Sequence, residues 1–140
     1  AYDMNEVARY YTASEDVAEF LAHYPERHDF REEAGGNRVF INVWCWEPAW
    51  KIRVTENGRE LPVRREQTED PLYVISYDIP QSVWKGKYPV DYGKRGKQHT
   101  LFTVDASGPA TTLEIEVTDS FGKVYRETMV RPKAFGPQMK

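Results

Sequence analysis

The stretch TTLEIEVTDSFGKVYRETMV, residues 111–130, decides the fold class. Leu, Ile and Val occupy every second position over 113–117 and alternate with Glu, which is typical of a strand with one buried face and one wet face. A turn at 119–122 leads into a second apolar-polar run over 124–130. The segment therefore predicts an antiparallel hairpin.

Enrichment in β-branched and aromatic residues predicts four further strand regions on the N-terminal side of this hairpin. They span 38–46, 50–63, 72–79 and 99–106. The region 50–63 contains Asn57-Gly58, the dipeptide that a type I′ hairpin turn prefers. Short strands separated by turns predict an all-β fold, an antiparallel β-sandwich of immunoglobulin or fibronectin III type.

A helix is indicated at only one place, residues 14–24, where Ser14 is a candidate N-cap and apolar residues follow at roughly helical spacing. A short edge strand is the alternative for these residues. At 140 residues the chain is predicted to be a single domain over 1–140, with a sandwich core over 38–130 and an N-terminal segment over 1–30. The start AYDMNE fits a mature chain or a fragment of a longer one, and we expect the fragment.

Composition excludes several classes of function. The net charge of −3 argues against general nucleic-acid binding, which needs an excess of Lys and Arg. No apolar run approaches the ~20 residues of a membrane-spanning helix, so no membrane insertion is expected. The single cysteine rules out an internal disulfide and any multi-cysteine metal site.

The run VFINVWCWEPAWKIRVTENG, residues 39–58, places three tryptophans within seven positions. In a strand over 38–46 one face would carry alternate apolar residues, with Cys45 buried and inert among them. The other face would carry Phe40, Asn42, Trp44 and Trp46. A strand that is apolar on both faces is usually covered on both. The cover could be a loop or the N-terminal segment of this chain, another domain, or a sugar ring stacked on the aromatics.

Candidate catalytic residues are few. The segment HYPERHD brings His23 and His28 close in sequence, but the intervening proline breaks any helix that would align them, and His99 stands alone. The acidic runs EQTED (66–70) and EE (32–33) are expected to be solvated surface. The sequence predicts no catalytic site, no metal site and no cofactor.

The segment WKGKYPVDYGKRGK, residues 84–97, interleaves aromatic and basic residues. Trp84, Tyr88 and Tyr92 alternate with cations that include Lys85 and Lys87. Such a loop could hold phosphate or stack on a base or sugar. The alternative is a solvated loop that supplies counter-charges to an acidic domain.

Three motifs in order resemble the C-terminal domain of secreted bacterial calcineurin-like phosphoesterases, and the resemblance covers about residues 8–135. The first is N-V-W followed by W-K and E-N-G, at residues 42–44, 50–51 and 56–58. The second is D-P-L at 70–72, and the third is V-T-D-x-F-G-x-x-Y-x-E at 117–127. The resemblance implies an immunoglobulin-like sandwich appended to a metallophosphatase.

In that family the catalytic domain carries the motifs D-x-H, G-D-x-x-D, G-N-H-[DE] and G-H-x-H, and none of them occurs here. The resemblance therefore implies a non-catalytic accessory domain of an exported, periplasmic or extracellular enzyme. This domain would dock on the catalytic domain of the same protein and could shape substrate access, with residues 1–30 as the crossing. The alternative is a carbohydrate-binding module that uses Trp44, Trp46 and Trp84; a small enzyme built around a histidine is less favoured. The candidate docking or ligand surface, for a carbohydrate or a phosphorylated ligand, comprises Phe40, Asn42, Trp44, Trp46, Trp84, Lys85, Lys87, Tyr88, Tyr92 and His99.

Overall fold

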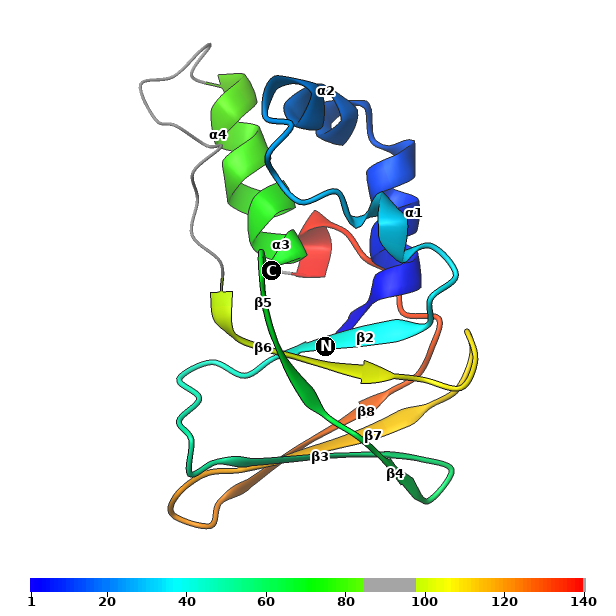
Figure 1. Ribbon diagram of the computed structural model, residues 1–140, viewed down its shortest axis with the longest axis vertical. Coiled ribbons are helices and arrows are strands. Elements are labelled where there is room, and N and C mark those ends of the chain that lie inside the picture. Colours follow the sequence, from blue (N-terminus) through cyan, green and yellow to red (C-terminus); the bar gives the residue numbers. More distant parts are fainter. Residues whose placement is uncertain (85–97, 140) are drawn as a thin grey trace.

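The computed structural model describes residues 1–84 and 98–139, without the side chains of 83–84 and 98–99. The fold consists of two four-stranded antiparallel sheets, ordered β1-β2-β6-β5 and β4-β3-β7-β8, and a set of short helices (Figure 1). The strands are β1 (Tyr2–Asp3), β2 (Arg38–Asn42), β3 (Lys51–Glu56), β4 (Arg59–Leu61), β5 (Arg64–Thr68), β6 (Gln98–Asp105), β7 (Leu113–Thr118) and β8 (Val124–Met129). The helical elements are α1 (Met4–Ala13), α2 (Glu15–His23), η1 (Phe30–Glu33), α3 (Pro71–Tyr73), η2 (Val74–Asp78), α4 (Ile79–Trp84) and η4 (Pro137–Met139). In the described residues, no helix is long and apolar enough to span a membrane.

The predicted hairpins are confirmed. β7 and β8 pair along their whole length, from Leu113 opposite Met129 to Thr118 opposite Val124. β3 and β4 are joined by Asn57 and Gly58, whose φ angles of 51° and 76° are the positive values that a type I′ turn requires. The strand predicted over 99–106 is also confirmed, as β6.

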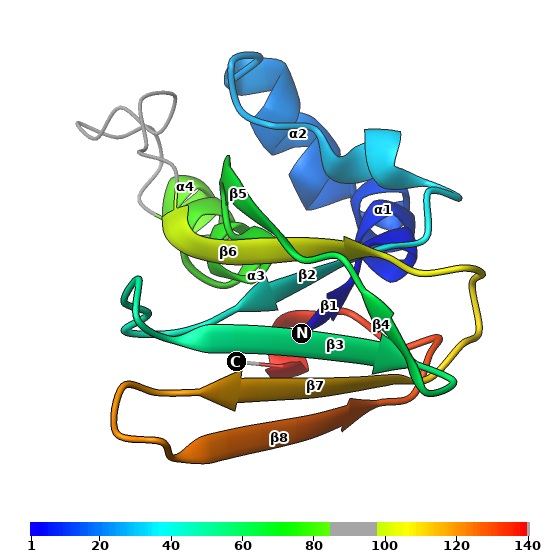
Figure 2. The same cartoon turned by 60° about the horizontal axis from the view of Figure 1, so that its bottom comes forward.

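The two sheets pack against each other around one shared core, and Figure 2 shows β3, β7 and β8 of the second sheet side by side. Their shared core is formed by alternate apolar residues of both sheets, which comprise Val39, Ile41, Val43, Val54, Leu61, Phe102, Val104, Leu113, Ile115 and Met129. The antiparallel two-sheet arrangement agrees with the sequence, whereas the immunoglobulin or fibronectin III type stays a prediction.

A helical layer covers the other face of the first sheet (Figure 1). Phe40 is only 1% exposed and lies in a second core with residues of α1, α2 and η1, including Tyr11 and Phe30. Its ring meets that of Phe30 edge-on, with centroids 6.1 Å apart. The second apolar face of β2 is therefore covered by this chain itself, largely by its N-terminal segment.

The N-terminal segment is more helical than expected. The helix over 14–24 is confirmed as α2, and the Ser14 hydroxyl accepts a hydrogen bond from the Val17 N–H at 3.3 Å. Tyr10 and Tyr11 lie in α1, and Tyr11 is buried with its ring edge-on to that of Phe30. Asp3 caps that helix by accepting from the Asn5 N–H at 3.2 Å.

The strand predicted over 72–79 is wrong, because this segment is helical. Asp70 accepts hydrogen bonds from the N–H groups of Leu72 and Tyr73, and Pro71 occupies the first helical turn. An Asp-Pro start stabilises a helix strongly enough to override the β propensity of the residues that follow. Val74, Ile75 and Ile79 then face the helix-side core.

Two further expectations are corrected. The strand over 38–46 ends at Asn42, and Cys45 lies exposed in a turn with φ 60° rather than buried mid-strand. The acidic run 66–70 is not all solvated, because Glu69 and Asp70 are buried. Glu69 is buried because it forms an ion pair with buried Arg27, whose guanidinium also contacts Asp78 at 2.8 Å.

Candidate functional site

Trp44 is an exposed aromatic residue just beyond the end of β2, with 69% of its surface accessible. It follows β2 in the turn that leads to β3, and it lies between two hollows. The inter-sheet hollow has a volume of ≈ 380 Å³ and opens between the sheets. The helix-side hollow has a volume of ≈ 550 Å³ and opens between β2 and the helices that follow Asp70. We call Trp44 and these two hollows the Trp44 surface.

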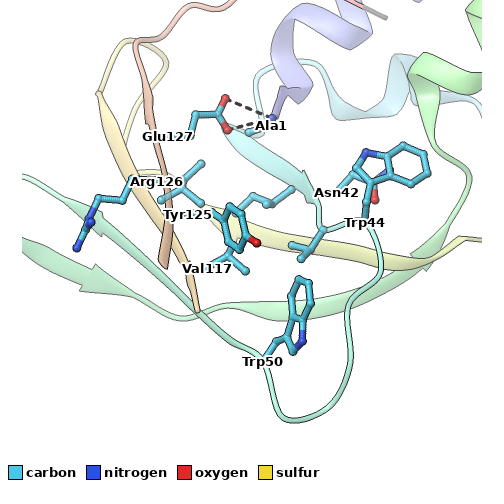
Figure 3. Close-up of a pocket in the computed structure, with 11 residues that line it drawn as sticks. Ala1, Asn42, Trp44, Trp50, Val117, Tyr125, Arg126 and Glu127 are labelled. Atoms are coloured by element: carbon cyan, nitrogen blue, oxygen red, sulfur yellow. Dashed lines mark hydrogen bonds and ion pairs between the residues drawn. The ribbon is translucent and has the colours of Figure 1, made fainter. Parts of the chain in front are cut away.

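The inter-sheet hollow is lined by residues of both sheets and of the turn between β2 and β3. Figure 3 shows Trp50, Val117 and Tyr125 around the hollow, with Trp44 at its rim. Ala1 and Glu127 close one side, where the nitrogen of Ala1 donates to the Glu127 carboxylate at 3.3 Å (Figure 3). The hollow is therefore mainly apolar and aromatic, with the contact between Ala1 and Glu127 at its edge.

The helix-side hollow is lined mainly by aromatic and apolar side chains, by the buried carboxylate of Asp70 and by Lys133, whose ammonium donates to the Glu127 carboxylate at 3.2 Å. Tyr73 and Tyr77 lie in its wall with their rings tilted at a centroid distance of 5.0 Å. Asp70 is 4% exposed and accepts four hydrogen bonds. The donors are the Tyr2 hydroxyl at 3.1 Å, the Asn42 amide at 2.7 Å, and the N–H groups of Leu72 at 2.9 Å and Tyr73 at 3.5 Å.

The polar groups of this wall are thus satisfied within the chain. Four donors occupy the acceptor sites of this one carboxylate. The side-chain amide oxygen of Asn42 (Oδ1) in turn accepts from the Thr100 hydroxyl at 2.7 Å. Burial and the neighbouring Asp70 charge raise the pKa of Tyr2 well above its ordinary value of 10, so its phenol stays neutral and keeps donating.

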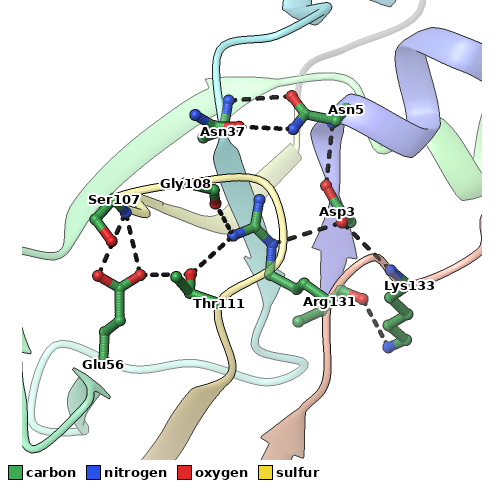
Figure 4. Close-up of polar contacts among 10 residues, drawn as sticks. Asp3, Asn5, Asn37, Glu56, Ser107, Gly108, Thr111, Arg131 and Lys133 are labelled. Carbon is green, nitrogen blue, oxygen red and sulfur yellow. Dashed lines mark hydrogen bonds and ion pairs between the residues drawn. The ribbon is translucent and has the colours of Figure 1, made fainter.

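A second polar cluster, at the opposite end of β8, is structural. The buried Arg131 guanidinium donates to the Gly108 carbonyl at 2.7 Å and contacts Asp3 at 3.5 Å (Figure 4). Glu56 accepts from the Thr111 hydroxyl at 2.6 Å and from the Ser107 N–H at 3.1 Å. These contacts fix the 106–111 loop to β3 and to the start of α1.

The residues singled out from the sequence fall in different places. Asn42 and Trp44 line both hollows, while Phe40 is covered by helices. Trp46 lies apart from both hollows, with its ring 5.2 Å from that of Phe102 and the Arg65 guanidinium 4.5 Å above it. The remaining candidates lie outside the described residues or side chains; they are Trp84, Lys85, Lys87, Tyr88, Tyr92 and His99.

Several residues of the Trp44 surface are not among the site residues predicted from the sequence. Trp50, Asp70 and Tyr125 appear there only as parts of motifs or of the tryptophan run. Tyr73 and Tyr77 belong to the segment that was predicted to be a strand and is helical. The Asp-Pro step before residue 72 was the available signal for that helix.

The described part of the chain offers no group of three or more His, Cys, Asp or Glu side chains that could hold a metal ion. His28 contacts Glu32 at 3.0 Å and packs edge-on against Phe30, and His23 is exposed on α2. What the described residues present at this site is an aromatic surface.

Comparison with known proteins gives one finding. A family model described as "C terminal of Calcineurin-like phosphoesterase" matches residues 2–125. Neither the curated proteins nor the solved structures gave a match. Since the matched region covers most of the chain, this protein belongs to the family of C-terminal domains of calcineurin-like phosphoesterases.

Proposed function

We propose that this chain is a non-catalytic accessory domain that docks on the catalytic domain of its own phosphoesterase through the Trp44 surface. The observation that carries the proposal is the 69% exposure of Trp44 between two hollows with aromatic walls. Exposed apolar patches of this kind mark contact surfaces, and buried tryptophans dominate the energy of many interfaces.

The chemistry of the helix-side hollow favours a protein partner. A sugar is recognised by polar groups that are free to bind its hydroxyls, but Asp70 and Asn42 already bind donors and acceptors of this chain. What the hollow offers is the faces and edges of Trp44, Tyr73 and Tyr77. Such a surface fits apolar or aromatic side chains of another domain.

The position of Ala1 supports the choice of partner. A C-terminal domain follows its catalytic domain along the chain, so the connection would enter at Ala1. Ala1 lines both hollows. A domain tethered at this point would have a high effective concentration next to the Trp44 surface. Docking here would place the accessory domain beside the phosphoesterase and could shape access of its substrate. The exported location stays a prediction of the family resemblance.

The test is Trp44→Ala in the full-length protein, with Val130→Ala as the matched control. Val130 is also an exposed apolar residue, 66% accessible, but it lies past the other end of β8. We expect Trp44→Ala to weaken docking by about 2 kcal/mol or more. Calorimetry should then resolve two separate unfolding transitions where the unmodified protein and Val130→Ala show a merged one. Identical traces for the two variants would contradict docking through Trp44.

Carbohydrate binding is the second candidate, favoured by the exposure of Trp44 beside the Tyr73–Tyr77 pair. Acrylamide quenching of tryptophan fluorescence, repeated with a panel of oligosaccharides, separates the two candidates. An emission shift caused by one glycan and abolished by Trp44→Ala would favour the carbohydrate-binding module. Indifference to every glycan, with Trp44 protected in the full-length protein, is the result that docking predicts.

A further inference from the structure

The first sheet has an incomplete edge. β1 contains only Tyr2 and Asp3, which pair with Phe40 and Val39 of β2. β2 continues to Asn42, and its other side is paired with β6 throughout. In the described part of the chain, no strand lies along β2 beyond β1 on this edge.

The hydrogen-bonding pattern leaves the backbone of Asn42 directed at that edge. The Val43 N–H donates to the Thr100 carbonyl of the opposite neighbour at 2.9 Å. In an antiparallel ladder, successive residues direct their backbone groups to alternate sides. Because Val43 faces β6, the N–H and C=O of Asn42 face the open edge.

The two hollows of the Trp44 surface flank this edge, one on each side of the sheet. Extending the β1–β2 register by one residue places Ala1 opposite Ile41. The residue immediately before Ala1 would then lie opposite Asn42. The residue one position earlier would lie opposite Val43. Opposed residues point to the same face of a sheet. Asn42 lines both hollows, and its side chain contacts Asp70 on the helix side at 2.7 Å. Val43 lines the inter-sheet hollow alone.

We propose that the two residues immediately before Ala1 in the full-length protein extend β1 along β2 and fill both hollows. The residue immediately before Ala1 exchanges two backbone hydrogen bonds with Asn42 and places its side chain beside Trp44, Leu72 and Tyr73. The residue one position earlier places its side chain between the sheets, against Val43, Val117 and Tyr125. The inference rests on the proposed function, because it requires the protein to continue before Ala1.

The walls define the chemistry of these two residues. The helix-side wall is aromatic, and the Asp70 carboxylate is already saturated, so an apolar or aromatic side chain fits there. The inter-sheet wall is formed by Val43, Val117 and the rings of Trp50 and Tyr125, so an apolar side chain fits there as well. The segment is therefore an extended pair of apolar residues that connects the two domains and anchors one of them.

Hydrogen exchange of single backbone amides, measured by NMR, tests this inference on three proteins. They are residues 1–140, the same chain preceded by its six native residues, and the full-length protein. We expect the Asn42 amide to exchange at least about 100-fold more slowly in the two longer proteins than in residues 1–140. The Val43 amide is the internal control, because its bond to Thr100 is present in all three.

The outcomes separate this inference from docking. Equal Asn42 exchange in all three proteins overturns the strand extension. Protection in the full-length protein alone also overturns it, since the edge is then covered by another segment of the catalytic domain. Protection with six added residues confirms the extension even if Trp44→Ala leaves docking unchanged.

A pair of proline variants in the chain with six native residues sharpens the test. Proline immediately before Ala1 removes the N–H that the Asn42 carbonyl would accept, so Asn42 protection should fall at least about tenfold. Proline one position earlier should leave it unchanged, because that N–H would point out of the sheet. Equal behaviour of the two variants would contradict the proposed register.

Discussion

Replacing Asp70 by alanine should destabilise the fold strongly, because one carboxylate joins three elements. It accepts from the Tyr2 hydroxyl of β1, from the Asn42 amide at the end of β2, and from the N–H groups of Leu72 and Tyr73 at the start of α3. Loss of a helix cap costs about 1 kcal/mol. A buried hydroxyl that loses its bond to a charged acceptor costs about 1.5–2 kcal/mol, and the half-buried amide about 1 kcal/mol.

The expected loss in the free energy of unfolding is therefore about 3.5–4 kcal/mol. For a chain of this length, that corresponds to a fall in Tm of about 10 °C. Urea unfolding of residues 1–140, followed by tryptophan fluorescence and circular dichroism, measures it. Asp70→Asn keeps the volume but presents an amide donor to existing donors, so it should also destabilise, by about 2 kcal/mol.

Asp105→Ala is the matched control. Asp105 contacts Arg64 at 2.9 Å, but both side chains are more than half exposed. An exposed ion pair contributes about 0–1 kcal/mol, so this variant should unfold close to the unmodified chain. If Asp70→Ala loses less than about 1 kcal/mol, the carboxylate does not join these elements and the account of the helix-side hollow fails.

Two further predictions concern Glu56 and Cys45. Burial alone would raise the pKa of Glu56, but hydrogen bonds from Thr111 and Ser107, with the Arg131 charge, hold it below its ordinary value of 4.5. The contribution of ionised Glu56 to the stability of the fold is therefore complete above about pH 4.5 and is lost as the pH falls further. In Glu56→Gln, the urea concentration at the unfolding midpoint should therefore decrease less steeply as the pH is lowered. An equally steep decrease in this variant would contradict the prediction. Cys45 is exposed in its turn, so a disulfide reagent should label one thiol per chain without denaturant, whereas labelling that requires unfolding would show that the cysteine is buried.

The strands that could be predicted were those whose pattern is local. The 111–130 hairpin shows a period of two over a full strand, and Asn57-Gly58 encodes its turn in two residues. The helix over 14–24 carries its own cap at Ser14. In each case a few neighbouring residues contain the whole signal.

The errors occurred where a local pattern fitted two structures. The apolar run 72–79 satisfies a strand by composition, and only the cap formed by Asp70 and Pro71 makes it a helix. The carboxylates at 69 and 70 look like solvated surface until Arg27, some forty residues earlier, is placed against Glu69. Such contacts depend on how distant segments pack, which periodicity does not record.

A small β-rich domain and its two confirmed hairpins could be predicted from the sequence, and the motifs indicated the phosphoesterase C-terminal family that the family model confirms. Only the tertiary structure decided what covers the second face of β2 and where the open aromatic surface lies. Phe40 and Trp44 share one apolar run, yet helices bury the first and the turn after Asn42 leaves the second exposed. The physical reason is that a residue's burial depends on which distant elements reach it, while its own sequence neighbours fix only the face on which it lies.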